Sequence, residues 1–418
     1  MAIDGKTIVI LGGGVGGLTT ATELRKRLDK KHKVILIDKN REYISYSSSL
    51  WVLCGCRKEE DIKKDISRLI ANGIEFINEE IIKIDPANKT VKTNKRDIVC
   101  DYLIISLGVS LAPELVPGLT DAFKKNAYNL YELDGILKTR DAINNFSKGN
   151  LVVLVCALPY KCPVAPNEGS LLLNYFFTKK GVRNNVNIKL CTPEILPMGG
   201  NGPTTGSIVK GLMEGVRIEY NSQHKVVSID SEKNEIAFDN GKKISYDLLL
   251  AIPPHKTPKV VVESGLTDND WIPIDKGTMK TKFENVYALG DVAKIKLPGE
   301  WKQGVPLMLS KGGVFAHYEA KVIAENIANE ILGKKERVEY TGRAACFVET
   351  GFGKAGLAQG YFFTTPTPNT VFLKPSRILH LSKVLFEKFW LSESPFKKVI
   401  DVILEKTAYG EFKRIVKG

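Results

Sequence analysis

Seven cysteines are the side chains of this sequence best suited to redox chemistry, and they stand at positions 54, 56, 100, 156, 162, 191 and 346. Two of them fall in NLVVLVCALPYKCPVAPNE, Asn150 to Glu168, where an apolar strand runs into Cys156, Pro159 and Cys162. An odd number of scattered cysteines argues against a secreted disulfide framework and favours thiol chemistry or simple burial. The sequence has neither zinc-type cysteine spacing nor a histidine cluster, so we expect no metal site.

A glycine-rich turn near the N-terminus has the pattern of a dinucleotide site. The segment KTIVILGGGVGGLTTATELRKRL passes from an apolar strand through Gly12, Gly14 and Gly17 into a helical pattern. Gly12 permits a tight turn, Gly14 lets the backbone approach a pyrophosphate, and Gly17 lets the helix pack closely on the strand. A second strand, KVILID, ends in Asp38, which is placed to hydrogen-bond a ribose. Together these features predict a dinucleotide-binding unit.

Two later segments indicate that the dinucleotide is FAD. CDYLIISLGVSLAPELVPGL is a strand that leaves the first domain through Gly108, and TKFENVYALGDVAKI is a strand that ends in Gly290 and Asp291. In flavoproteins with two dinucleotide domains, the aspartate of this last element contacts the ribityl chain and the next helix directs its N-terminus at the flavin. Lys311, at the start of that helix, has two interpretations: a charge on the flavin or quinone side, or an ordinary helix-start lysine.

These elements predict an α/β fold with two Rossmann-like dinucleotide-binding domains. We expect an FAD-binding domain split into residues 1–118 and 268–338, with a second Rossmann-like domain, 119–267, inserted between the two parts. Residues 339–418 are expected to form a C-terminal element with amphipathic helices at a membrane surface.

The inserted domain lacks the glycine motif that would bind a nicotinamide cofactor. No G-x-G-x-x-G pattern occurs between Leu151 and Gly169, and Pro159 and Pro163 would remove amide donors from a phosphate cradle. Electrons are therefore expected to reach the flavin from another donor, through cysteine.

At this point the sequence resembles a known family. PYKCPVAPNE resembles the cysteine segment of sulfide:quinone oxidoreductases and of the flavoprotein subunit of flavocytochrome c sulfide dehydrogenases. GRAACFVETGFGKAGLA resembles their second cysteine segment, and AIPPHKTP and LSKGGVFAHYEA resemble their flavin-side loops. The resemblance implies that Cys162 and Cys346 are a redox pair beside the flavin and that Glu168 accepts a proton. It further implies FAD-dependent oxidation of sulfide to sulfur or polysulfide, with electrons passed to a membrane quinone.

The chain departs from this family in one segment, because a third cysteine present in many members is missing from DAFKKNAYNLYELDGILKTRDAI. A cycle with two cysteines is therefore implied. Cys54 and Cys56 have two interpretations: a thioether to FAD or an auxiliary sulfur carrier, or two small apolar residues in a turn. Cys156 is expected in the core of its strand, and Cys100 and Cys191 are expected to be buried thiols.

The C-terminal tail favours contact with a membrane surface. Apolar residues recur with helical spacing in two segments: Ile378, Leu381, Val384, Leu385 and Phe389, then Phe396, Val399, Ile400 and Ile403. Helices of this kind, with interleaved lysines, suit the lipid headgroup region, and the alternative is a helix pair docked on the protein's own core or on a dimer partner. Phe347, Phe352 and Phe363 are candidates to line a quinone site.

The net charge of +13 agrees with an anionic membrane partner, or with a lysine-rich solvated surface. No nucleic-acid recognition motif is present, so nucleic acid is not an expected partner. No apolar run is long enough for a membrane span, and a strand starting at Lys6 leaves no room for a signal peptide. We therefore expect a peripheral membrane protein on the cytoplasmic face, which could form a homo-oligomer.

Two other functions share this architecture. One is a type II NADH dehydrogenase or an NAD(P)H-dependent disulfide reductase, which the missing second glycine motif disfavours. The other is a non-catalytic flavin-binding scaffold with residual cysteines, which would retain FAD that no sulfur compound reduces.

Overall fold

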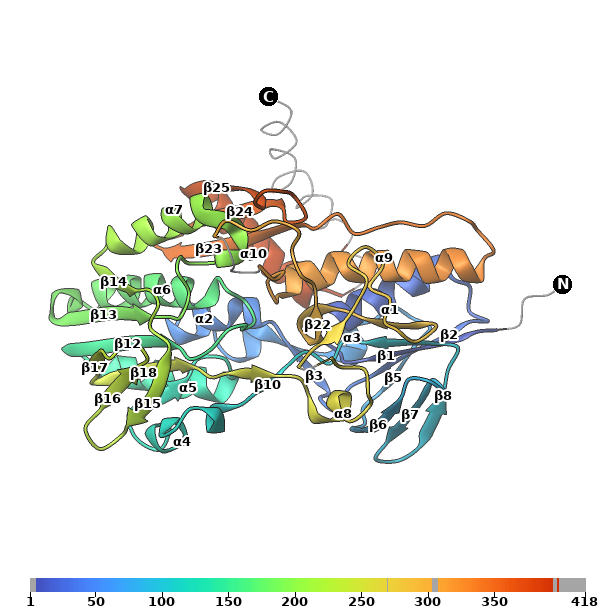
Figure 1. Cartoon of the computed structure of the whole chain (residues 1–418), viewed down its shortest axis with the longest axis horizontal. Helices are drawn as coiled ribbons and strands as arrows, with labels where there is room; N and C mark the ends of the chain where they lie inside the picture. The colour runs from blue at the N-terminus through green and yellow to red at the C-terminus, as the bar shows by residue number, and fades with distance from the viewer. Residues whose placement is uncertain (1–4, 269, 303–306, 394–396, 398–418) are drawn as a thin grey trace, which may run out of the picture.

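Two five-stranded parallel sheets, each flanked by helices, make up the two halves of the molecule (Figure 1). The computed structural model describes residues 5–268, 270–302, 307–393 and 397. The α/β class with two Rossmann-like cores is as the sequence predicts.

The first sheet joins strands from distant parts of the chain, in the order β21-β9-β1-β2-β5. Its strands are β1 Thr7–Leu11, β2 Lys33–Ile37, β5 Ile74–Ile77, β9 Tyr102–Ile105 and β21 Val286–Ala288. Helices α1 (Val15–Arg27) and α9 (Gly313–Ile331) pack against each other on one face of this sheet. The central strands are apolar at nearly every position because both faces of the sheet are covered.

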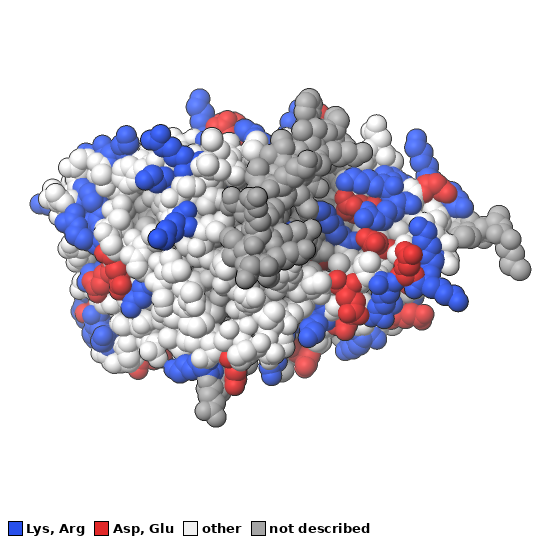
Figure 2. Space-filling model, turned by 90° about the horizontal axis from the view of Figure 1, so that it is seen from above, with Lys and Arg blue, Asp and Glu red and all other residues white. Residues whose placement is uncertain are grey.

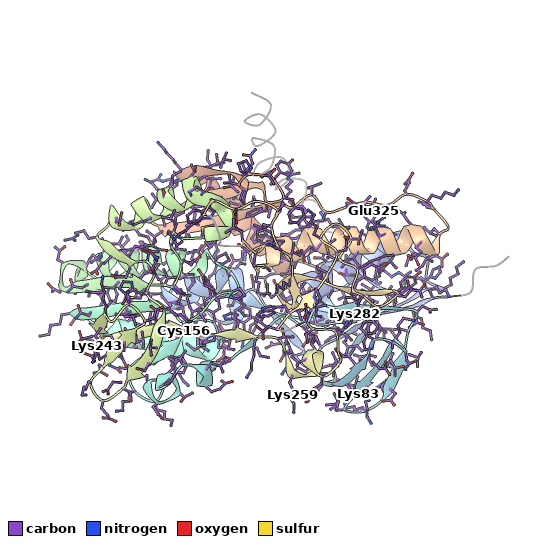
Figure 3. All side chains as sticks on the ribbon, viewed as in Figure 1. Lys83, Cys156, Lys243, Lys259, Lys282 and Glu325 are labelled. Carbon is purple, nitrogen blue, oxygen red and sulfur yellow. The ribbon has the colours of Figure 1, made fainter. Side chains whose placement is uncertain are left out.

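The second sheet has the order β11-β18-β12-β13-β14 and is also parallel. Its strands are β11 Ala127–Asn129, β12 Gly149–Val155, β13 Val186–Cys191, β14 Ile218–Asn221 and β18 Leu248–Ile252. The helices of this half are α5 Leu133–Asn145, α6 Ala165–Lys179 and α7 Gly202–Glu214. Cys156 follows β12 and lies inside this half, 3% exposed, as its strand predicts (Figure 3).

Short antiparallel sheets and helices complete both halves. The three-stranded sheets are β6 Ile81–Asp85, β7 Thr90–Thr93 and β8 Asp97–Val99, and β15 Val226–Asp230, β16 Glu235–Phe238 and β17 Lys243–Ser245. The strand pairs are β3 Glu42–Ile44 with β4 Lys63–Asp65, β10 Ser110–Leu111 with β19 His255–Lys256, and β20 Ile272–Pro273 with β22 Ala293–Lys294. The short helices are α2 Ser49–Leu53, α3 Ile66–Leu69, α4 Leu119–Ala122 and α8 Lys259–Val262.

The pair β10–β19 sits where the chain leaves the first half and where it returns. The two crossings are therefore hydrogen-bonded side by side, which fixes the halves relative to each other.

The C-terminal region contains a sheet as well as the expected helix. Strands β23 Arg343–Gly351, β24 Lys354–Tyr361 and β25 Asn369–Ser376 form an antiparallel sheet over the second half, and α10 Arg377–Leu391 packs on β24 (Figure 1). The second amphipathic segment, with Phe396, Val399, Ile400 and Ile403, lies outside the described residues. Within the described part of the chain, no helix has the length and apolar character needed to cross a membrane.

Candidate functional site

A cavity of about 1630 Å³ extends along the boundary between the two halves. Its lining comes from the N-terminal glycine turn, from the loop before α6, from β23 and from α10. Of the residues singled out in the sequence, those that line it are Gly12, Gly14, Asp38, Gly108, Cys162, Glu168, Gly290, Asp291, Cys346 and Phe347. One continuous space thus joins a dinucleotide motif to two cysteines.

The glycine turn has the shape that a dinucleotide cradle requires. Gly12 has φ +101°, and a β-carbon there would lie 2.4 Å from the carbonyl oxygen of Ser106. A β-carbon at Gly17 would lie 1.8 Å from the carbonyl oxygen of Gly12, so α1 can approach the turn only with glycine at this position. Gly14, by contrast, faces open space at the N-terminus of α1. The Asp38 carboxylate accepts the amide of Gly13 at 2.6 Å and also lines the cavity. These residues fit the pyrophosphate and ribose of FAD.

The loop after β21 forms another part of the cavity wall, with Leu289 close to Gly16 of the glycine turn. Gly290 has φ +70° and its amide donates to the buried Glu319 carboxylate at 2.7 Å. Burial raises the pKa of Asp291, and the positive charges of Lys161 and Lys311 oppose that rise. Asp291 lines the cavity at this wall, and its contact with the ribityl chain of FAD stays a prediction.

Lys311 holds this wall from behind, without lining the cavity. Its ammonium donates to the carbonyl oxygens of Asp291 at 2.5 Å and Ala293 at 3.1 Å, and lies 3.6 Å from the ring centroid of Trp271. Burial lowers its pKa to about 8. The backbone carbonyl of Lys311 accepts the amide of Cys162 at 2.6 Å. Lys311 therefore connects the loop after β21 to the loop that carries Cys162, and its backbone carbonyl helps to position that cysteine.

The loop between β12 and α6 presents Cys162 in an unusual backbone conformation. Its φ is +52°, a left-handed value that costs a non-glycine residue about 1–2 kcal/mol. Besides the bond to Lys311, its carbonyl oxygen accepts the Tyr131 hydroxyl at 3.0 Å and the Ala165 amide at 2.9 Å. Three hydrogen bonds thus fix the position where the thiol enters the cavity, just before the N-terminus of α6.

Both cavity thiols are held mainly in the protonated form. The side chain of Cys162 is exposed to the cavity, yet the surrounding protein desolvates it and raises its pKa to about 11. The charge of Glu168 adds to this rise, whereas the Ala165 amide and Lys383 oppose it. On β23, burial, followed by the charges of Cys162 and Glu168, raises the pKa of Cys346. Thiolate formation here therefore needs a proton acceptor close by.

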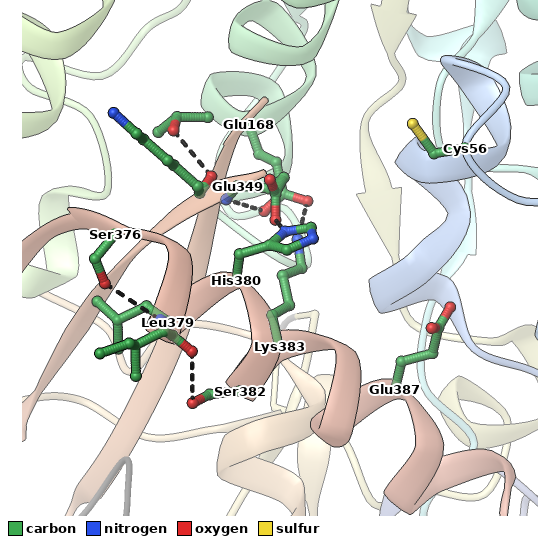
Figure 4. Close-up of polar contacts among 12 residues, drawn as sticks. Cys56, Glu168, Glu349, Ser376, Leu379, His380, Ser382, Lys383 and Glu387 are labelled. Atoms are coloured by element: carbon green, nitrogen blue, oxygen red, sulfur yellow. Dashed lines mark hydrogen bonds and ion pairs between the residues drawn. The ribbon is translucent and has the colours of Figure 1, made fainter. Parts of the chain in front are cut away.

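Glu168 is the first member of a buried ionic network that ends near the surface (Figure 4). Its carboxylate contacts the Lys383 ammonium of α10 and accepts the backbone amide of Glu349 at 3.1 Å. The Glu349 carboxylate contacts Nδ1 of His380 at 2.9 Å, and the His380 side chain is 28% exposed. Burial raises the pKa of Glu349, while Lys383 and His380 oppose that rise. The network can accept a proton at the cysteines and pass it outward.

Three aromatic side chains of β23 and α10 line the part of the cavity that we call the aromatic end. Phe347 of β23 and Phe386 of α10 have ring centroids 5.9 Å apart, and Phe386 and Trp390 are 5.8 Å apart. All three line the cavity. Such a surface suits a flat aromatic or quinonoid ring.

The other two phenylalanines singled out in the sequence lie elsewhere. Phe352 is 48% exposed and packs on Tyr175. Phe363 packs on Tyr340 beside the hydrophobic core formed with α1 and α9. Neither is among the cavity-lining residues.

Sequence reasoning missed the contribution of α10 to the site. Lys383, Phe386 and Trp390 follow each other at positions i, i+3 and i+7, so they share one helix face. A lysine within such an apolar stripe was the available signal. The stripe that we noted instead includes Ile378 and Leu381, which the structure leaves 74% and 62% exposed.

Several known proteins are similar to this chain over most of its length. Residues 6–155 match the family model described as pyridine nucleotide-disulphide oxidoreductase. The sulfide-quinone reductase of Aquifex aeolicus is 28% identical over 403 residues, which cover 92% of this chain and 90% of that protein. The mitochondrial sulfide:quinone oxidoreductase of Dictyostelium discoideum is 26% identical over 365 residues, covering 84% and 77%. The crystal structure of sulfide:quinone oxidoreductase from Aquifex aeolicus superposes with a TM-score of 0.81 at 24% identity, covering 96% of each chain.

Residues 6–155 therefore carry the match to the pyridine nucleotide-disulphide oxidoreductase class, and the whole chain shares its fold with the Aquifex enzyme. FAD is the cofactor of that class, as the sequence predicts. Over most of its length the chain is similar to sulfide:quinone oxidoreductases, the family that the sequence segments resemble.

Proposed function

We propose that this enzyme oxidises sulfide to sulfur or polysulfide at Cys162 and Cys346 and passes two electrons through FAD to a membrane quinone. The observation that carries this proposal is the shared cavity. The glycine cradle, both thiols, the acid Glu168 and an aromatic end all line it.

The two cysteines supply the sulfur chemistry in this proposal. Hydrosulfide attacks a Cys162–Cys346 disulfide, so that one sulfur becomes a persulfide and the other leaves as a thiolate. The hydrogen-bonded loop before α6 holds Cys162 at the cavity wall, and β23 holds Cys346. Because burial disfavours thiolate at both positions, negative charge that develops on Cys162 depends on the Lys383 ammonium and the Ala165 amide.

Glu168 is the proton acceptor for this step. Its carboxyl group is 6% exposed and contacts the Lys383 ammonium, so a proton that it takes from the incoming sulfide reduces the negative charge next to the thiols. The adjoining Glu349 and His380 give that proton a route to solvent. Gly12, Gly14 and Asp38 would hold the pyrophosphate and ribose of FAD, with Asp291 on the ribityl side. When bound, FAD accepts the electron pair released by sulfur oxidation and delivers it to quinone.

The aromatic end is the proposed quinone site, and it contains Phe386 and Trp390 in place of the Phe352 and Phe363 predicted from the sequence. Phe347 remains part of this site. We further propose that the enzyme is a peripheral protein on the cytoplasmic face of a membrane. Ile378 and Leu381 project outward from α10, and Figure 2 shows a broad area with few charged side chains on the side of the molecule that carries the C-terminal sheet.

The test is an anaerobic titration of the flavin absorbance with sulfide. Wild-type enzyme should bleach rapidly and recover its colour with quinone, whereas Cys346→Ala should not bleach. Cys56→Ala is the matched control, since Cys56 lies outside the cavity lining, and it should behave like wild type. Bleaching by NADH with none by sulfide would overturn the proposal and favour a type II NADH dehydrogenase or related reductase. FAD that neither reagent reduces would favour a non-catalytic scaffold.

A further inference from the structure

Cys54 and Cys56 meet at the C-terminal end of the short helix α2, and the turn that ends this helix explains why. The Gly55 amide donates to the carbonyl of Val52 at 3.1 Å, and the Cys56 amide donates to that of Trp51 at 2.8 Å. These two bonds, with Gly55 at φ +75°, make the Schellman turn that commonly closes helices. The turn reverses the chain between the two cysteines, so their sulfur atoms lie 3.4 Å apart.

The two thiols differ in exposure and in acidity. Cys54 is 8% exposed, and its thiol points at the sulfur of Cys56 and the carbonyl of Trp51. Cys56 is exposed to solvent. The hydrogen bond from Cys54 and the nearby charge of Arg57 lower the pKa of Cys56 to about 7, although partial burial and Glu349 oppose the change. The exposed sulfur therefore forms a thiolate more readily than an ordinary cysteine, with the Cys54 thiol in contact as a hydrogen-bond donor.

We propose that Cys54 and Cys56 form a second redox-active dithiol that reacts with small molecules containing a sulfur–sulfur bond. Neither residue lines the cavity that holds Cys162 and Cys346, so this site faces solvent separately. An exposed nucleophilic thiolate next to a shielded thiol is the arrangement by which dithiols accept oxidation and then resolve it.

The reaction is an exchange in two steps. The Cys56 thiolate attacks one sulfur of a small disulfide, forming a mixed disulfide and releasing one thiolate. Cys54 then loses its proton to solvent and attacks the Cys56 sulfur, forming the Cys54–Cys56 disulfide and releasing the second thiolate. The protein loses two electrons and the small disulfide gains them. With an inorganic polysulfide, the mixed species is a persulfide on Cys56 and the final leaving group is hydrosulfide or a shorter polysulfide.

The site suits reversible exchange better than permanent cross-linking. One residue separates the cysteines, so closing the bond restrains the unfolded chain very little. Arg57 also belongs to this neighbourhood: its guanidinium pairs with Glu387 of α10 at 2.8 Å and donates to the Cys56 carbonyl at 3.0 Å. These contacts fix the backbone beside the reactive sulfur.

The experiment follows one tryptic peptide of the FAD-loaded enzyme. Residues 42–57, EYISYSSSLWVLCGCR, contain both cysteines and no other. Prereduced enzyme is incubated with oxidised glutathione or with inorganic polysulfide. It is then alkylated and digested, and the mass of the peptide is measured by mass spectrometry. Wild type should yield this peptide unalkylated and lighter by two hydrogen atoms. Cys54→Ser should instead stop at a glutathione adduct or a persulfide on Cys56.

Two controls separate this proposal from the function of the cavity. The same result is expected in a Cys162→Ala/Cys346→Ala background, where the proposed sulfide oxidation is absent. Alkylation of Cys56 by iodoacetamide should rise with a midpoint near pH 7, whereas an ordinary cysteine has a midpoint of about 8.5. Reaction with polysulfide alone would restrict the substrate to inorganic sulfane sulfur. A fully alkylated peptide after both reagents, or loss of the reaction in the double alanine background, would overturn the proposal.

Discussion

Replacing Lys383 with methionine tests whether α10 holds the site through one buried ion pair. The side chains of Lys383 and Glu168 are 5% and 6% exposed, so their charges have little solvent to screen them. Methionine keeps a long apolar side chain while removing the ammonium. Among the residues that the structure describes, the Glu168 carboxylate would then keep one hydrogen-bond partner, the amide of Glu349.

The loss of stability in Lys383→Met depends on whether the Glu168 carboxylate stays charged or takes up a proton. Removing one partner of a buried ion pair costs about 3–5 kcal/mol. The carboxylate can limit this cost by taking up a proton, which for a glutamate of ordinary acidity costs about 1.36 kcal/mol per pH unit above about 4.3. That limit is about 3.7 kcal/mol at pH 7 and about 1 kcal/mol at pH 5. The loss of stability should therefore grow as the pH rises, because the folded variant holds a proton that the unfolded chain releases.

The assay is urea unfolding of the FAD-loaded enzyme at both pH values. We expect Lys383→Met to lose about 3 kcal/mol at pH 7 and about 1 kcal/mol at pH 5. The double variant Glu168→Gln/Lys383→Met should recover most of the loss, since no charge is left unpaired. Lys388→Met, on the exposed side of α10, is the matched control and should change stability by less than about 0.5 kcal/mol. A loss below about 1 kcal/mol at pH 7, or an equal loss at both pH values, would refute the reasoning.

Three further predictions concern other parts of the structure. Burial raises the pKa of Glu319 to about 7, so its contribution to stability is present below pH 4.5 and is lost as the pH rises through 7; unfolding of Glu319→Gln should lack this loss of about 3 kcal/mol. Phe386→Ala should raise the KM for quinone about tenfold and leave bleaching by sulfide unchanged; equal slowing of both half-reactions in stopped flow would contradict the quinone site. Ile378→Ser/Leu381→Ser should weaken sedimentation with anionic liposomes by at least about tenfold, since each exposed side chain contributes about 1.5 kcal/mol or more when buried in lipid; unchanged sedimentation would place membrane contact elsewhere.

The dinucleotide-binding unit could be predicted from the sequence because its signals are local. The strand Thr7–Leu11, the glycine turn and the helix Val15–Arg27 are consecutive, and a β-carbon at Gly12 or Gly17 would clash with the backbone. The absence of a second glycine motif could also be recognised in the sequence. In the structure, the loop between β12 and α6 carries Cys162 where that motif would lie. What the pattern could not give was the hydrogen bond from Cys162 to Lys311, which joins residues 149 positions apart.

The C-terminal sheet, and the contact of α10 with the cavity, could not be predicted from the sequence. The spacing of apolar residues identifies a helix face but does not say what covers it, and α10 has an outer apolar stripe as well as an inner one. The pairing of Lys383 with Glu168 spans 215 residues and depends on how the C-terminal sheet docks over the second half. No periodicity within either segment contains that information.

The position of α10 links the two roles proposed for the C-terminal region. Ile378 and Leu381 face outward, where a lipid surface would meet them, while Lys383 and Phe386 face the cavity. A quinone leaving the lipid at this helix would meet the aromatic end of the cavity within two turns of the same helix. The helix that would contact the membrane is thus also the wall of the proposed quinone site, and its lysine holds the acid beside the cysteines. In the proposed mechanism, electron exit and proton exit would therefore both depend on α10, through Phe386 and Trp390 for the quinone and through Lys383 for the acid.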